Sequence, residues 1–335
     1  MLEGFRELYP ILGRHTCAAP IATCGIQRYV YDAKRRCARL ARRIWNDPDM
    51  ANRLENEAAE LKVRFNRDFW IADKQYFALA LDGKKQKVDS RTSNLGHLLW
   101  SGIVDKAESC SRQLLRPRLF SGWGIRTMAE GEGGYNPIGY HIGTLWPLDN
   151  SLVPQGLRNY EFDEQAATVI FANLETGRYF DYRFPEAFAG YPRVQTQFPV
   201  EYPTACSPQA WSCSAPLLFL RTMFGLEPVG KRLLVDPAVP KQIERLELLG
   251  IHGRWHRADV FARELINIPS DETRFAVAQK PPRCDCANAV ANPQGGETPQ
   301  IRTTANRKIV MSGYIELRRR VQSDVVSRDP RKPSP

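Results

Sequence analysis

Residues Ala33–Phe69 read AKRRCARLARRIWNDPDMANRLENEAAELKVRFNRDF and decide the fold class. Apolar residues recur at spacings of three and four on both sides of Asn46-Asp47-Pro48, which is the period of an amphipathic helix. Aspartate followed by proline is a typical helix start, so we predict that one helix ends near Ile44 and another begins at Pro48. Because the connection is short, the two helices are expected to pack as an antiparallel hairpin.

Four further helices are predicted along the chain. They are expected at residues 93–114, after Trp146-Pro147, at residues 166–174 and from Ser207-Pro208 onward. Pro154 is expected to kink or shorten the second of these. Long aromatic loops rich in Gly and Pro separate the helices, and short strands are expected near residues 228–256. We therefore predict an all-α fold of helical hairpins with functional loops at one rim.

Composition narrows the class of protein and its compartment. The 335 residues, 43% of them hydrophobic, are enough for a sizeable core. No apolar run approaches the roughly 18 residues of a membrane span, and residues 1–17 lack the pattern of a secretion signal. Eight scattered cysteines suit free thiols in a reducing compartment, so we predict a cytoplasmic protein without membrane association. Cys284 and Cys286 lack companion ligands, and we predict neither a metal nor a cofactor.

The net charge of +10 raises the question of nucleic-acid binding. Residues 266–335 hold 12 Lys and Arg against 7 Asp and Glu, a net +5, and show no apolar period. We interpret them as a basic, mostly disordered tail. No nucleic-acid-binding motif accompanies the charge, so a basic interaction protein is a weaker hypothesis.

Several long segments resemble one known family and occur in its order. They are CGIQRYVYDAK (24–34), RFNRDFW (64–70), FALALDGKKQKVDSRTSNLGHLLWSGI (77–103), LFSGWGIRTM (119–128), YNPIGYHIGTLWPLDNSLVPQGL (135–157), RFPEAFAGY (183–191) and YPTACSPQAWSCSAP (202–216). The chain from Pro20 to Val260 thereby resembles the C-terminal half of bacterial amylo-α-1,6-glucosidase-like proteins, or glycogen-debranching enzymes. The resemblance implies an incomplete (α/α)6 toroid of six-hairpin glycosidase type.

The resemblance also implies inverting hydrolysis of an α-linked glucoside. That reaction uses one carboxylate as base and one protonated carboxyl as acid. Glu186, in Arg183-Phe184-Pro185-Glu186, matches the family segment R-L-P-E and is our candidate base; alternatively it is a surface glutamate beside a proline. The family's acid resembles an aspartate in W-K-D-S before the helix C-E-V-Q-G-Y-V-Y. The residues before Cys24 contain no aspartate, so we expect impaired catalysis.

The remaining candidates are assigned to substrate binding through the same segments. They are Trp123, Arg126, Tyr140, His141, Trp146, Asp149, His97, Gln209 and Trp211. Trp123 and Trp146 are expected to stack against a sugar, Arg126 to orient Glu186, and Asp149 to bind a hydroxyl or fix a neighbour. Several also have a structural alternative: a salt bridge for Arg126, a buried carbonyl for His97, core packing for Gln209 and Trp211, and a structural Trp-Pro turn for Trp146.

Three departures from the family segments weaken the expected sugar site. Gly25 stands where the family has Glu, and Ile142 and Leu148 stand where it has polar residues in Y-H-N-G and W-P-H-D. Each loses a hydrogen-bonding group, at a cost of roughly 1–3 kcal/mol per unpaired partner. A truncated or degenerate relative that binds sugar without cleaving it is therefore the alternative function.

The predicted organisation has three parts. Residues 1–16 are unmatched, residues 17–260 form the glycosidase-like domain, and residues 266–335 form the tail. The expected ligand is an oligosaccharide or glucan. Half a toroid would expose apolar helix faces, so we expect a homo-oligomer or a partner chain that carries the missing half.

Overall fold

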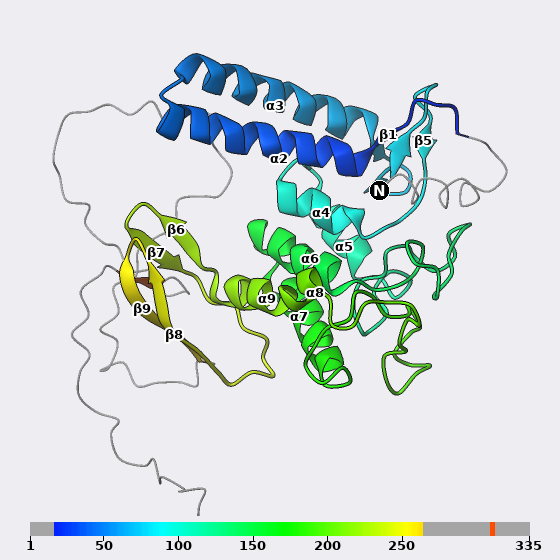
Figure 1. Cartoon of the computed structure of the whole chain (residues 1–335). Coiled ribbons are helices and arrows are strands. Elements are labelled where there is room, and N and C mark those ends of the chain that lie inside the picture. Colours follow the sequence, from blue (N-terminus) through cyan, green and yellow to red (C-terminus); the bar gives the residue numbers. More distant parts are fainter. Residues whose placement is uncertain (1–16, 264–308, 312–335) are drawn as a thin grey trace, which may run out of the picture.

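The computed structural model describes residues 17–263 and 309–311, which form a helix-rich body with short strands (Figure 1). Helix α2 (Cys24–Leu40) continues into a π-helical turn, η1 (Ala41–Trp45), and returns along α3 (Pro48–Asp68). Asp47 caps α3 by accepting a hydrogen bond from the Met50 amide at 2.9 Å. The small buried residues Ala38, Ala41 and Ala51 let the two helices approach closely. The predicted hairpin is confirmed.

The helix predicted over residues 93–114 is two helices, and the prediction of one is wrong. Helix α4 (Asn94–Ser101) ends at Gly102, whose φ of +80° lies in the left-handed region that glycine tolerates. Helix α5 (Ala107–Leu114) follows after a short connection.

Helix α6 (Pro147–Asn159) occupies the centre of the body. It continues past Pro154, so the proline does not shorten it as predicted, and α7 (Asp163–Gly177) returns beside it. Helix α6 packs against α4 almost backbone to backbone, because a Cβ on Gly156 would lie 2.6 Å from the Gly96 oxygen. This close approach brings the N-termini of α4 and α6 together.

The last predicted helix begins later than expected. Gln209, not Ser207, is the N-terminal cap of α8 (Ala210–Cys213), and α9 (Ala215–Phe224) follows at Ser214. Helices α2, α4, α6 and α9 form a row in which each contacts the next. No helix in the described ranges is long and apolar enough to cross a membrane.

Short strands make the fold helix-rich rather than all-α. The sequence did not predict the sheet β1-β4-β5 or the pair β2-β3, whose bounds are β1 (Ala22–Thr23), β2 (Trp70–Ile71), β3 (Tyr76–Phe77), β4 (Ala80–Leu81) and β5 (Lys87–Val88). The strands expected near residues 228–256 are confirmed as β6 (Glu227–Val229), β7 (Arg232–Val235), β8 (Arg245–Gly253) and β9 (His256–Arg263).

One strand lies within the predicted tail. β10 (Ile309–Met311) pairs antiparallel with β7, so the expected lack of regular structure is wrong for these three residues. The other residues of the predicted tail, and the unmatched residues 1–16, lie outside the described residues.

Candidate functional site

Glu186 lies on the loop after α7, next to two buried residues and against the loop that contains Cys206. Phe184 and Pro185 are buried, and the Glu186 amide donates to the Cys206 carbonyl at 2.8 Å. The carboxylate accepts from the Tyr140 hydroxyl at 2.5 Å through Oε1 and from the Cys206 amide at 3.4 Å through Oε2. Both oxygens are therefore oriented while the side chain remains half-buried.

Aromatic rings gather beside this carboxylate. Tyr140 meets Trp146 edge to face at 4.8 Å and lies 5.5 Å from Tyr202, measured between ring centroids. His141 stacks on Trp146 at 5.6 Å, and Trp211 meets Trp146 at 6.0 Å. We call Glu186, Tyr140, His141, Trp146, Tyr202 and Trp211 the Glu186 cluster. His141 and Trp211 are exposed, so the cluster reaches solvent.

The loop Tyr140–Trp146 is closed by its own hydrogen bonds. The Thr144 hydroxyl and the Trp146 indole both donate to the Tyr140 carbonyl, at 2.6 and 3.1 Å. Gly143 is required at this turn because a Cβ there would lie 2.1 Å from the Asn136 oxygen. The tight turn sets the Tyr140 and Trp146 rings against each other.

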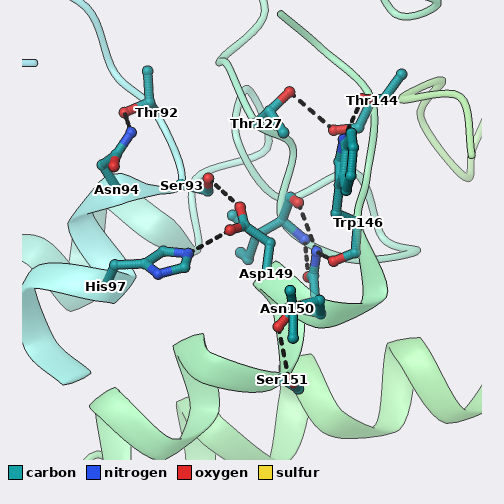
Figure 2. A network of polar contacts seen from close by, with 12 residues as sticks. Thr92, Ser93, Asn94, His97, Thr127, Thr144, Trp146, Asp149, Asn150 and Ser151 are labelled. Carbon is teal, nitrogen blue, oxygen red and sulfur yellow. Dashed lines mark hydrogen bonds and ion pairs between the residues drawn. The ribbon is translucent and has the colours of Figure 1, made fainter. Parts of the chain in front are cut away.

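Asp149 lies in the first turn of α6 and is the centre of a second polar group. Figure 2 shows Ser93 and His97 at the start of α4 pointing toward it: the Ser93 hydroxyl and the His97 Nε2–H donate to its two oxygens, the latter at 2.5 Å. Burial alone would raise the pKa of Asp149, but the charge and hydrogen bonds of His97, the Ser93 hydroxyl and the charge of Arg28 together lower it. Asp149 is therefore an ionised acceptor.

The two groups share the beginning of α6. Trp146 is its N-cap residue and Asp149 is three residues further on. His97, a candidate for substrate binding with a buried carbonyl as the structural alternative, contacts the Asp149 carboxylate instead of a carbonyl. Among the described residues, Nδ1 of His97 is buried without a hydrogen-bond partner.

Trp123 was predicted to stack on a sugar, and this prediction is wrong in the structure. Its side chain is 1% exposed and packs in a separate cluster with Leu145 and Phe188. The Arg193 guanidinium lies 4.3 Å from its ring centroid, and Tyr179 meets its edge. No face of the indole remains open for a ligand.

Arg126 does not orient Glu186 as predicted. Its fully buried guanidinium donates to the backbone oxygens of Gly190 at 2.6 Å, Pro117 at 2.8 Å and Arg118 at 3.1 Å. These bonds tie the Glu186 loop to the segment before residue 119. The partners of Arg126 are therefore backbone carbonyls and not the Glu186 carboxylate.

The start of α8 completes the surroundings of Glu186. Ser212 donates to the Glu186 carbonyl and to the Gln209 side chain, each at 3.4 Å, and Trp211 meets Trp146. Sequence reasoning missed Tyr202, Cys206 and Ser212. All three fall in the quoted segment YPTACSPQAWSCSAP, so the signal that could have found them was present.

The substituted positions lie close to these groups. The Cβ position of Gly25 is 3.4 Å from the Asn94 Oδ1 at the start of α4, and Ile142 and Leu148 are half-buried. The described residues contain no group of three His, Cys, Asp or Glu side chains placed to hold a metal ion.

Comparison with known proteins decides the family. Residues 13–189, more than half of the chain, match the model described as the mannosylglycerate hydrolase MGH1-like glycoside hydrolase domain. The chain belongs to this family. It is an MGH1-like glycoside hydrolase domain, which confirms the glycosidase resemblance at this coarser level. No curated protein matches the chain.

Two solved structures have a similar fold. A sialidase superimposes with a TM-score of 0.57 at 14% identity over 72% of this chain. The GH63 mannosylglycerate hydrolase from Thermus thermophilus, in complex with glucose, gives 0.50 at 19% identity over 60% of this chain. The MGH1-like chain spans 23% of the former and 48% of the latter. At these identities the likeness concerns the fold.

Proposed function

We propose that this MGH1-like domain binds an α-linked glucoside of the glycogen-debranching type, with Glu186 as the base of an inverting hydrolysis. The observation that carries the proposal is the Glu186 carboxylate, held at both oxygens and set beside an aromatic cluster that reaches solvent at His141 and Trp211. An oriented carboxylate can activate a water below the sugar, and aromatic faces with polar groups are the usual means of holding a sugar.

A catalytic role lacks an identified proton donor. An inverting enzyme needs a second carboxyl group, kept protonated, about 6.5–9.5 Å from the base. Asp149 is unsuited because its pKa is lowered, and we assign it to binding a sugar hydroxyl. Burial and the neighbouring Glu186 raise the pKa of Tyr140, so this hydroxyl stays protonated as a donor to Glu186.

A non-catalytic carbohydrate-binding role is the second candidate. It is favoured by Gly25, Ile142 and Leu148, which offer a sugar no side-chain hydrogen bond. Under this proposal the Glu186 cluster still holds the saccharide, but no acid protonates the leaving group. Loss of a general acid lowers rates by about 10²–10⁴-fold.

Glucose release from an α-1,6-linked oligosaccharide tests both roles. We expect measurable binding, followed in parallel by tryptophan fluorescence, and very low release that falls further in Glu186→Gln. Glu60→Gln, an exposed position on α3, is the matched control and is expected to change neither. Fast release abolished by Glu186→Gln would exclude the non-catalytic role, and binding with no release at all would exclude the catalytic one.

The proposal extends to a partner and a compartment. Helix α2 contacts α4, yet Ile26, Val30, Leu40 and, in η1, Ile44 are 39–69% exposed. We infer that a second copy, or a chain carrying the remaining hairpins of a toroid, covers this face; a monodisperse monomer in sedimentation would contradict it. The free cysteines among the described residues favour the cytoplasm as the site of action.

A further inference from the structure

An apolar stripe runs along one side of helix α2 and into η1. Its spacing alternates between four and three residues, which is the heptad repeat of a helix that pairs with another helix. The residues of this α2 stripe are Ile26, Val30, Ala33, Cys37, Leu40 and Ile44. The four large aliphatic side chains among them are 39–69% exposed, so the stripe is open to solvent in the described part of the chain.

The α2 stripe is not the side that α2 uses to pack inside this chain. Helix α2 contacts α3 and α4 (Figure 1). The buried residues of α2 are Cys24, Arg28, Tyr31 and Ala38. Ile26, Val30, Ala33 and Leu40 each come two positions after one of these buried residues, which is about 200° around a helix. The stripe therefore lies opposite the packed side of α2.

Basic side chains border the stripe. The segment Cys24–Trp45 contains seven Lys and Arg and one Asp, a net charge of +6. Arg36 and Arg43 each follow a stripe residue by three positions, beside the stripe on the same edge. Arg36 pairs with Asp32 yet keeps a side chain that is 54% exposed, while Arg43 is exposed and has no ion-pair partner among the described residues. The edge of the stripe is thus positively charged.

Spacing and charge together specify the partner. Side chains at heptad positions fit between those of a facing helix, and charges beside the heptad decide which helix is accepted. A second copy would bring two segments of net +6 together, and like charges placed across an interface disfavour it. A helix with apolar residues on one side and Glu or Asp beside them satisfies both the stripe and its basic edge.

We propose that the α2 stripe is the docking site for an acidic amphipathic helix of another chain. The stripe spans about 27 Å from Ile26 to Ile44, so the partner helix would need about five turns to cover it. This inference rests on the part of the proposed function that assigns a partner to this face, and it names the chemistry of that partner.

Two synthetic peptides of three heptads test the proposal on the full chain. Both carry Leu at the two core positions of each heptad, and one carries Glu and the other Lys at the flanking positions. Each peptide repels itself, so neither pairs with its own copies. In fluorescence anisotropy at about 0.1 M salt we expect the Glu peptide to bind about 10- to 100-fold more tightly than the Lys peptide. The preference should shrink at about 1 M salt, because exposed charges are then screened.

Variants separate the apolar and the charged contributions. Leu40→Asp is expected to weaken binding of the Glu peptide at least about 10-fold, because it puts a charge in the middle of the stripe. The double variant Arg36→Gln and Arg43→Gln should bind the two peptides with nearly equal affinity. Val63→Asp and Arg53→Gln, both at exposed positions of α3, are the matched controls and are expected to change neither affinity.

Three outcomes overturn the inference, and they differ in what they leave standing. Equal affinity of the wild type for the two peptides removes the charge argument, and an unchanged affinity in folded Leu40→Asp removes the stripe. Sedimentation in the presence of the Glu peptide gives the third. Self-association that persists at saturating peptide and is lost in Leu40→Asp would show that a second copy covers the stripe, which overturns this inference but keeps the proposed partner. A monodisperse monomer that binds neither peptide overturns the proposed partner as well.

Discussion

Two neighbouring regions each contain a tryptophan and a charged side chain, but one region is buried and the other reaches solvent. Trp123 and Arg126 are sealed in the interior, whereas Trp146 and Glu186 belong to a cluster that reaches solvent. The backbone joins the two regions, since Arg126 bridges to Leu145 and Leu145 bridges to Phe188. Leu145 precedes Trp146, and Phe188 follows Glu186 by two residues.

This arrangement separates the side chains that hold the backbone from those of the Glu186 cluster. Arg126 and Trp123 hold the segments from one side, and the same segments present Trp146 and Glu186 on the other. The hydrogen bond from Arg126 to the Gly190 carbonyl fixes the chain four residues after Glu186. Arg126 can thus support the backbone of the Glu186 loop without contacting the Glu186 carboxylate.

The largest expected effect on stability comes from removing the Arg126 side chain that supports the Glu186 loop. We expect Arg126→Met to lower the free energy of unfolding by about 3–5 kcal/mol, because three backbone carbonyls lose the buried, charged side chain that donates to them. Urea denaturation followed by circular dichroism measures the change, and Arg39→Met should stay within about 0.5 kcal/mol of wild type. A folded Arg126→Met protein of normal stability that fails to bind sugar would assign Arg126 to sugar binding instead.

Sequence patterns predicted the helices well where the signal was local. The stripe ending at Ile44 and the Asp47-Pro48 cap gave α2 and α3 because amphipathic period and capping are written in consecutive residues. Gly102 was passed over, although its left-handed conformation divides α4 from α5. The two-residue strands β1–β5 are too short to show a period of two, so tertiary pairing alone defines them.

The site was predicted through motifs, and the motifs do not encode burial. Glu186, Tyr140 and Trp146 come together as the resemblance implied, whereas Trp123 lies in the core beneath Arg193. Cys206 was missed because it acts through its backbone, for which residue type gives no signal. The chemistry of a side chain is visible in the sequence, but the side of the backbone on which it lies is not.

Removing the Asp149 charge at the start of α6 is expected to have a smaller effect on stability. Asp149→Asn should lower the free energy of unfolding at pH 7 by about 2 kcal/mol, because the hydrogen bonds from Ser93 and His97 lose their charged acceptor. The pKa of Asp149 is lower in the folded chain, so its contribution is complete above the unfolded value of about 3.9 and is lost as the pH falls through the folded value.

The measurement is the difference in unfolding free energy between wild type and Asp149→Asn at pH 7 and near pH 3. The difference should shrink at the lower pH, because the wild-type carboxylate becomes protonated while the amide does not titrate. A difference that stays constant over this range would mean that the Asp149 charge contributes nothing to folding.

The smallest expected effect tests the contact that orients the candidate base. Tyr140→Phe removes the hydroxyl that donates to Glu186 and keeps the ring against Trp146, so we expect a loss of about 1 kcal/mol in unfolding free energy at pH 7. Tyr202→Phe, a neighbouring ring, is the matched control. Equal losses in the two variants would show that the Glu186 contact adds no specific stability.

The pH dependence of this small difference identifies its source. Burial, the hydrogen bond to Glu186 and the Glu186 charge all raise the pKa of Tyr140, so the folded chain holds the phenolic proton more tightly than the unfolded chain. The contribution is therefore complete below the unfolded value of about 10 and is lost as the pH rises through the folded value. The gap between wild type and Tyr140→Phe should stay constant from pH 7 to about 9. If it instead disappears near neutral pH, the hydroxyl does not donate to an ionised Glu186, and the orientation of the candidate base must come from the Cys206 amide alone.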